Sequence, residues 1–320
     1  MQRTQNIRIS EQMLRQAAPV ITLLVMMVFV GIITPEFLTI DSMIVLATST
    51  ATLFVLAAGA TFVIMLGGID LSIQAIASMC SVVLALTLPN LGYLAFILAI
   101  GAGLLAGTLS GLAHVRLRIP SFIATLAAGG VWAGVALIIS DARAIAISGA
   151  ERDYLNWITG ATLGIPHEVF IGALVLVVSV FLQRFTMFGR ISTAIGAGEA
   201  ATWSSGVRVN MYKVMAFALS GLMAGLAGVI LAGRLSSGSP TLADEFLLPA
   251  IAAVIVGGTA LTGGVGSVWR TLIGALTISV IRLGMTFIGV DIFAQQIIFG
   301  VMLMIAVAIT IDRSKIPIVK

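Results

Sequence analysis

The residue types that catalyse reactions or bind metal ions are scarce in this chain, and they do not cluster. His114 and His167 are isolated, and neither an HExxH motif nor another closely spaced set of metal ligands occurs. The chain also lacks a G-x-x-x-x-G-K-[ST] phosphate loop, the usual backbone cradle for nucleotide phosphates. We therefore predict no catalytic residue, no metal site and no cofactor in this chain.

Two ionisable residues lie in or beside apolar runs, where charge is costly. Asp70 lies at the end of one run, and Arg282 lies well inside another. A charged group in lipid must pair with other protein groups or line a water-filled cavity, and both interpretations stay open for these residues. So small a supply of ionisable groups disfavours a proton-coupled carrier, which needs a relay of them.

Glycine is abundant, and two clusters of it are too dense for unbroken helices. The first is Gly67-Gly68-Ile69-Asp70-Leu71-Ser72, and the second runs from Gly257 to Ser267. Irregular backbone at membrane depth is tolerated only inside protein or beside a water-filled cavity. We predict helix breaks that flank a solute path, with a purely structural kink or loop as the alternative. The break residues are Gly67, Gly68, Gly257, Gly258, Gly263 and Gly264.

Polar residues near these breaks and near the end of the chain are the candidates for lining that path. They are Asp70, Ser72, Gln74, Thr259, Thr262, Arg282, Gln295 and Gln296. A different role is predicted for glycines spaced four residues apart, because small residues at that spacing let helices approach closely. Gly103, Gly107 and Gly111, and Gly221 with Gly225, are therefore expected to pack helices together.

The elements that must position these residues are membrane-spanning helices. The chain has 320 residues, of which 59% are hydrophobic and 9% charged, whereas about 25% are charged in an ordinary soluble domain. Its apolar runs repeatedly reach the roughly 20 residues needed to cross a hydrocarbon core. We predict an all-α integral membrane protein with about ten transmembrane helices. They cover residues 17–34, 43–66, 72–88, 91–113, 121–140, 168–183, 213–233, 248–262, 270–290 and 293–311.

The basic residues indicate how these helices are oriented. Cytoplasmic loops carry an excess of Lys and Arg, and an even number of spans puts both termini on one side. Placing both termini in the cytoplasm assigns thirteen of the 17 basic residues to that side. They are Arg3, Arg8, Arg15, Arg116, Arg118, Arg184, Arg190, Arg208, Lys213, Arg270, Arg313, Lys315 and Lys320.

This topology gives a cytoplasmic amphipathic segment over 1–16, a single transmembrane domain over 17–311 and a cytoplasmic tail over 312–320. We expect the first span to be uncleaved, because it is longer than the apolar core of a signal peptide. The outer connection 141–167 is either a docking surface for another protein or an ordinary solvated loop. The sequence of the inner connection 183–213 predicts a short helix followed by a turn, to which a soluble partner would bind. Cys80 is expected to pack as a small hydrophobe.

Three segments, taken in chain order, are similar to motifs of a known family. Residues 67–72 read GGIDLS, residues 196–210 read GAGEAATWSSGVRVN, and residues 248–267 read LPAIAAVIVGGTALTGGVGS. Together they resemble the permeases of ribose-type monosaccharide ABC importers over most of residues 40–311. The chain departs from that pattern after Arg282, where Leu283 stands at a position that is Asn in many relatives, so the solute stays open.

The resemblance implies an importer subunit in a bacterial inner membrane, which moves a monosaccharide or related solute. It implies a permease homodimer, a cytoplasmic ATPase that uses ATP and Mg²⁺, and a periplasmic solute-binding protein, with no nucleic-acid partner. It also implies an ATPase-coupling segment that includes Gly196, Gly198, Glu199, Ala200, Ala201, Ser205, Gly206 and Val207. The alternatives are a branched-chain amino acid or nucleoside ABC permease, an ion-coupled secondary carrier, and a non-transporting scaffold.

Overall fold

A computed structural model describes the backbone of residues 2–310 and the side chains of residues 17–305, with the exception of Ile292. The predicted tail over 312–320 and its basic residues lie outside the described residues. Within the described part, seven helices are long and apolar enough to cross a membrane. They are α2 (Ile40–Met65), α3 (Ile73–Leu91), α4 (Leu94–Leu117), α5 (Ser121–Ile139), α7 (His167–Phe185), α10 (Val209–Leu235) and α12 (Val268–Phe287). The chain is therefore an α-helical, multi-pass membrane protein.

Three other predicted spans differ from these seven. Helix α1 (Gln2–Ile33) and helix α13 (Ile292–Thr310) contain shorter apolar stretches, Ala17–Ile33 and Phe293–Ile305. Helix α11 (Leu247–Val256) has ten residues, which rise about 15 Å, half of a typical hydrocarbon core. The predicted span 248–262 contains two of the predicted break residues, Gly257 and Gly258, and the chain leaves the helix there. The total of ten spans stays a prediction.

The remaining elements are short and lie between the long helices. Two short helices, α8 (Met187–Ala197) and α9 (Glu199–Ser204), form the inner connection. Helix α9 and the turn after it confirm the predicted helix and turn, whereas α8 was not predicted. The outer connection contains β1 (Ile145–Ala146), η2 (Gly149–Leu155), α6 (Asn156–Thr159), β2 (Ala161–Thr162) and β3 (Ile165–Pro166). Strand β1 pairs with β4 (Ser237–Gly238), and β2 pairs with β3, both antiparallel. Two 3-10 turns, η1 (Pro35–Leu38) and η3 (Asp244–Phe246), precede α2 and α11.

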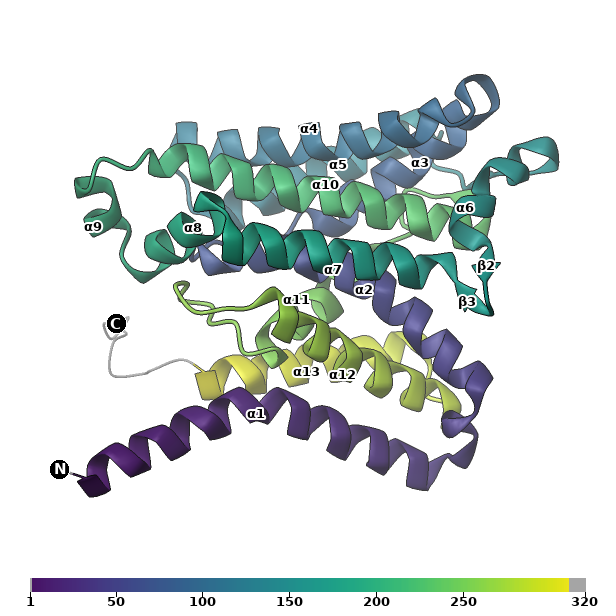
Figure 1. Cartoon of the computed structure of the whole chain (residues 1–320). Coiled ribbons are helices and arrows are strands. Elements are labelled where there is room, and N and C mark those ends of the chain that lie inside the picture. The colour runs from purple at the N-terminus through teal and green to yellow at the C-terminus, as the bar shows by residue number, and fades with distance from the viewer. Residues whose placement is uncertain (1, 311–320) are drawn as a thin grey trace.

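The long helices run side by side through one bundle (Figure 1). Helices α8 and α9 and the start of α1 lie at one end of the bundle, and α6, β2 and β3 lie at the other. Following the predicted topology, we call the α8–α9 end the inner end and the α6 end the outer end. Helices α2, α3 and α10 are the most enclosed of the seven, because each packs against several other helices.

Helices α4 and α10 cross at the predicted glycines with their backbones in contact. A Cβ atom added at Gly107 would lie 2.2 Å from the Phe217 carbonyl oxygen, and one added at Gly221 would lie 2.3 Å from the Gly103 carbonyl oxygen. Real Cβ atoms do not approach backbone so closely, so only glycine fits. The predicted packing role of these residues is confirmed.

Candidate functional site

The segment between α2 and α3 is irregular, and it contains the buried carboxylate of Asp70. Gly67 has a φ of 81°, which glycine adopts without strain. Asp70, 2% exposed, accepts hydrogen bonds from the Ser72 backbone N–H at 2.9 Å and the Ser72 hydroxyl at 2.6 Å. Its other oxygen accepts a hydrogen bond from the Ser220 hydroxyl of α10 at 2.8 Å. The carboxylate therefore ties this break to α10.

Replacing Asp70 distinguishes this structural role from a role in moving a charge. Asp70→Ala removes the acceptor of three buried donors, each worth about 1–3 kcal/mol when left unsatisfied. Asp70→Asn keeps an oxygen for Ser72, and its amide N–H can donate to Ser220. We expect thermal unfolding of the detergent-solubilised protein to rank wild type above Asp70→Asn and Asp70→Ala lowest, with solute uptake retained in Asp70→Asn. Normal folding of Asp70→Asn combined with complete loss of uptake would show that the charge itself is needed.

The loop between α11 and α12 meets the end of α2. Gly258, Gly263 and Gly264 all have positive φ, between 75° and 83°. The Gly264 N–H donates to the Met65 carbonyl oxygen at 2.9 Å. A Cβ atom added at Gly263 would lie 2.7 Å from the Gly67 backbone nitrogen. The two glycine-rich segments, nearly 200 residues apart in sequence, are therefore in backbone contact.

Gly196 of α8 packs into this same place. A Cβ atom there would lie 2.0 Å from the Met65 carbonyl oxygen and 2.3 Å from the Gly264 backbone nitrogen. We call the contact among Met65–Gly67, Gly263–Gly264 and Gly196 the glycine junction. It joins the predicted coupling segment directly to both predicted helix breaks.

Gln183, at the inner end of α7, clamps the junction and was missed by the sequence analysis. Its amide nitrogen donates to the Gly266 carbonyl oxygen at 3.0 Å and lies 3.3 Å from the Met65 sulfur. Its amide oxygen accepts from the Val268 N–H at 2.9 Å. The only sequence signal was an amide next to the apolar run 168–182, which by itself has no evident partner.

The rest of the predicted coupling segment forms an exposed rim at the inner end. Thr202 donates to the Ala194 carbonyl oxygen at 3.0 Å, which fixes α9 against α8. Glu199 forms an ion pair with Lys213 of α10 at 2.7 Å. Ala200, Ala201 and Ser205 belong to or follow α9, and Gly206, with a φ of 79°, makes the turn before Val207. Gly198 is extended, and a Cβ atom added there would meet only the Ala201 side chain, at 3.9 Å.

A cavity of about 320 Å³ lies beside the α2–α3 break at the inner end. Gly67 and Gly68 line it together with Glu199 and Lys213. Two predicted path residues near these breaks have buried side-chain oxygens without a hydrogen-bond partner among the described residues, namely Gln74 Oε1 and Thr259 Oγ1. Thr262 is exposed in the α11–α12 loop. The structure thus places five of the eight predicted path residues on or near the two breaks.

The other three predicted path residues gather at the outer end. Arg282 of α12 forms an ion pair with Glu245 of η3 at 2.6 Å, and its guanidinium lies 5.1 Å from the centre of the Phe246 ring. Gln296 donates to the Glu245 carbonyl oxygen at 3.2 Å. Gln295, 2% exposed, donates to the Thr286 hydroxyl and the Val290 carbonyl oxygen. The eight residues therefore form two groups rather than one site.

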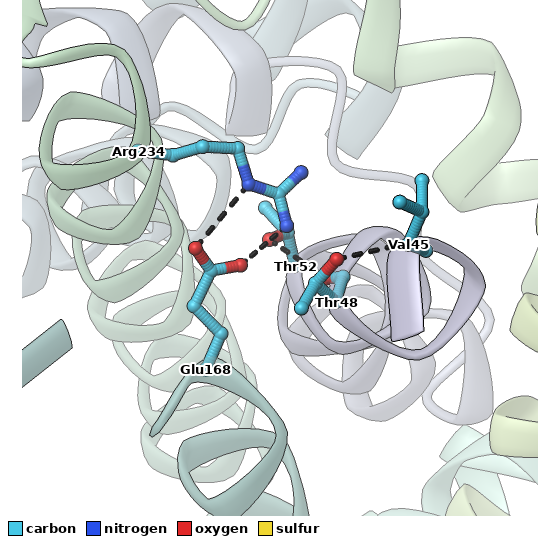
Figure 2. A network of polar contacts seen from close by, with 5 residues as sticks. All are labelled: Val45, Thr48, Thr52, Glu168 and Arg234. Carbon is cyan, nitrogen blue, oxygen red and sulfur yellow. Dashed lines mark hydrogen bonds and ion pairs between the residues drawn. The ribbon is translucent and has the colours of Figure 1, made fainter. Parts of the chain in front are cut away.

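A second ion pair, which the sequence analysis did not find, lies close to this outer group. Arg234 at the end of α10 forms two hydrogen bonds to the largely buried carboxylate of Glu168 in α7. Figure 2 shows this pair beside Thr48 and Thr52 of α2, with one guanidinium nitrogen directed away from Glu168. Glu168 and Arg234 lie 66 positions apart in sequence, and α7 and α10 each pack against α2, so this partnership depends on the arrangement of three helices.

The arrangement offers a polar region at each end of a tightly packed helix bundle. No group of three or more potential metal-binding side chains occurs among the described residues. His114 near the end of α4 is hydrogen-bonded to the Ile119 carbonyl oxygen, and His167 at the start of α7 to the Thr162 hydroxyl.

Comparison with known proteins identifies the family of this helix bundle. Residues 42–307 match the model of the family described as branched-chain amino acid transport system / permease component. The chain belongs to this family of transport permeases. The permease is also 34% identical to the ribose import permease of Haemophilus influenzae over 310 residues, 95% of each chain.

Two other relatives cover almost the whole permease. The ribose import permease of Bacillus subtilis is 36% identical over 305 residues, 94% of each chain. The L-arabinose ABC transporter permease of Azospirillum brasilense is 34% identical over 300 residues, which is 92% of this permease and 87% of the relative. The resemblance stated from the three motifs is therefore confirmed.

Proposed function

We propose that this protein is the membrane subunit of an ABC importer that takes up a monosaccharide or a closely related solute. The observation that carries the proposal is full-length similarity to permeases named for ribose and L-arabinose. The family description names branched-chain amino acids, and that solute class remains the alternative. The sugar-named relatives match at 34–36% identity along nearly the entire chain, so we favour a sugar.

In this proposal the chain lies in a bacterial inner membrane and has no ATPase activity of its own. It works with three partner proteins. A cytoplasmic ABC ATPase supplies ATP hydrolysis with Mg²⁺, a periplasmic binding protein delivers the solute, and a second permease copy completes the path. The transmembrane domain covers 17–311, with residues 1–16 and 312–320 in the cytoplasm. The predicted path residues line the route between the two polar regions.

Exposed apolar side chains at both ends support the docking of partners. Trp203 of α9 is 60% exposed at the inner end, beside the segment assigned to the ATPase. Leu163, at the tip of the β2–β3 hairpin, is 96% exposed at the outer end, within the segment 141–167. Aromatic and apolar side chains of this kind are enriched at the centres of protein interfaces.

Reconstitution tests the proposal. The permease, its ATPase and its binding protein in proteoliposomes are expected to accumulate radiolabelled sugar only when ATP is supplied to the ATPase side. Leaving out the ATPase or the binding protein should reduce uptake to the level of empty vesicles. Uptake driven by a sodium or proton gradient without any ATPase would contradict the proposal, and accumulation of leucine in place of sugar would favour the alternative solute.

A further inference from the structure

A cavity of about 240 Å³ lies at the outer end, between helices that come from distant parts of the chain. Helix α2 contributes Ser49, α10 contributes Arg234, η3 contributes Glu245, and α12 contributes Ser279 and Arg282. Typical pockets for drug-sized ligands measure roughly 300–1,000 Å³. The cavity therefore suits a smaller solute.

The charges around this cavity cancel in pairs. Arg282 pairs with Glu245 at 2.6 Å, and Arg234 pairs with Glu168 just behind the wall. A charged solute loses hydrating water when it enters the cavity. Because the cavity has no excess charge of opposite sign, no ionic interaction compensates for that loss. A zwitterion such as an amino acid would have to separate an existing ion pair. The cavity therefore favours a solute without charge.

Hydrogen-bonding capacity nevertheless remains on both sides of the cavity. No hydrogen bond among the described residues uses the hydroxyl of Ser49 or that of Ser279. A guanidinium carries five N–H donors, and Arg234 directs only Nε and Nη2 to Glu168. Leucines complete the wall with apolar surface, at positions 231, 235, 242 and 283. Hydroxyl groups of a solute would meet donors and acceptors here, and its C–H surfaces would meet leucine.

We propose that this outer cavity is a transient binding site for a neutral, polyhydroxylated solute, and that it rejects phosphorylated sugars and amino acids. This inference rests on the proposed importer function, and it goes further by naming the site and the chemical class that the permease itself admits. Arg282 and Arg234 act as donors whose charge is held balanced by Glu245 and Glu168. The binding protein is then not the sole filter for solute.

Cysteine labelling of the assembled transporter tests the proposal. The one native cysteine, Cys80, is fully buried, so the background reaction is low. Ser49→Cys on α2 and Leu283→Cys on α12 place a thiol on two walls of the cavity. In proteoliposomes that contain permease and ATPase, both are expected to react with a charged, membrane-impermeant thiol reagent added to the outer side.

Protection by solute identifies the class that binds. For a dissociation constant of about 1 mM, 10 mM D-ribose should slow the labelling about tenfold. Ribose 5-phosphate and leucine at the same concentration should leave the rate unchanged. The matched control is Leu126→Cys on α5, 63% exposed and expected to face lipid, which should not react with the charged reagent.

The following outcomes would contradict the inference. Lack of reaction at both thiols would mean that the cavity is closed to outside water, and equal protection by leucine or ribose 5-phosphate would refute the selectivity. Because the two thiols are on separate helices, one variant still tests the inference if the other does not fold. If the wild-type transporter shows no ATP-driven sugar uptake, the importer function itself fails. If uptake is normal and ribose protects neither thiol, only the outer cavity proposal fails.

Discussion

Replacing Gly196 by alanine is expected to reduce ATP-driven solute uptake at least about tenfold, the largest functional effect that a single added methyl group should have in this protein. The new Cβ atom would lie 2.0 Å from the Met65 carbonyl oxygen and 2.3 Å from the Gly264 nitrogen. Both are backbone atoms, so no side chain can turn away. Overpacking of this kind costs about 1–3 kcal/mol or more, and it must separate α8 from α2 or from the α11–α12 loop.

Uptake should fall because the glycine junction connects the proposed ATPase-coupling segment to both helix breaks. Gly196 begins the segment proposed to contact the ATPase, Met65 precedes the first helix break, and Gly264 belongs to the second. A forced gap there would let α8 and α9 move without moving the two breaks. ATP hydrolysis by the assembled transporter is therefore expected to continue while uptake falls, so fewer solute molecules enter per ATP.

The measurement is the ratio of solute uptake to ATP hydrolysis in proteoliposomes. Gly101→Ala in α4 is the matched control, because an added Cβ there has no neighbour within 4 Å. It should behave as wild type. Gln183→Leu gives a second route to the same result, since it removes the amide that holds the loop without changing any residue of α8 or α9. A wild-type ratio in both Gly196→Ala and Gln183→Leu would refute the coupling role of the junction.

Replacing Gly221 or Gly107 by alanine is expected to give a large loss of stability. The added Cβ atom at Gly221 would lie 2.3 Å from the Gly103 carbonyl oxygen, and that at Gly107 would lie 2.2 Å from the Phe217 carbonyl oxygen. Helix association in membranes depends on such close packing of small residues, because lipid supplies no hydrophobic drive between helices. Thermal unfolding should shift down by roughly 5 °C or more.

Gly130→Ala in α5 is the control for this stability measurement. Its added Cβ has no neighbour within 4 Å, so it makes the same chemical change in a helix without a close contact. Thermal unfolding in detergent, followed by the loss of monodisperse protein, compares the three variants directly. If Gly221→Ala and Gly107→Ala unfold at the same temperature as Gly130→Ala, the α4–α10 contact does not limit stability.

The sequence predicted the local features well, because each depends on neighbouring residues. Apolar runs predicted the seven long helices, and the spacing of Gly103, Gly107 and Gly221 predicted a close helix contact. Cys80 is buried as expected of a small hydrophobe. Within the predicted span 248–262, the helix ends at Val256, directly before the predicted break residues Gly257 and Gly258.

Partnerships across the bundle could not be predicted in the same way. Asp70 and Arg282 were left between pairing and lining a wet cavity. The structure shows that Asp70 is fully engaged with Ser72 and Ser220, whereas Arg282 pairs with Glu245 and also lines a cavity. Nothing local distinguishes these two cases. The partners are 150 residues away for Ser220 and 37 for Glu245.

By itself, then, the sequence determined that this chain is a membrane-embedded helix bundle, where its helices break, and which family it belongs to. Hydropathy and glycine density are properties of short segments, and lipid imposes the same rules on every segment. Only the tertiary structure decided that the two breaks touch each other and Gly196, and that Arg234 and Arg282 share one cavity. Those contacts arise from how the helices pack, and no short segment contains that information.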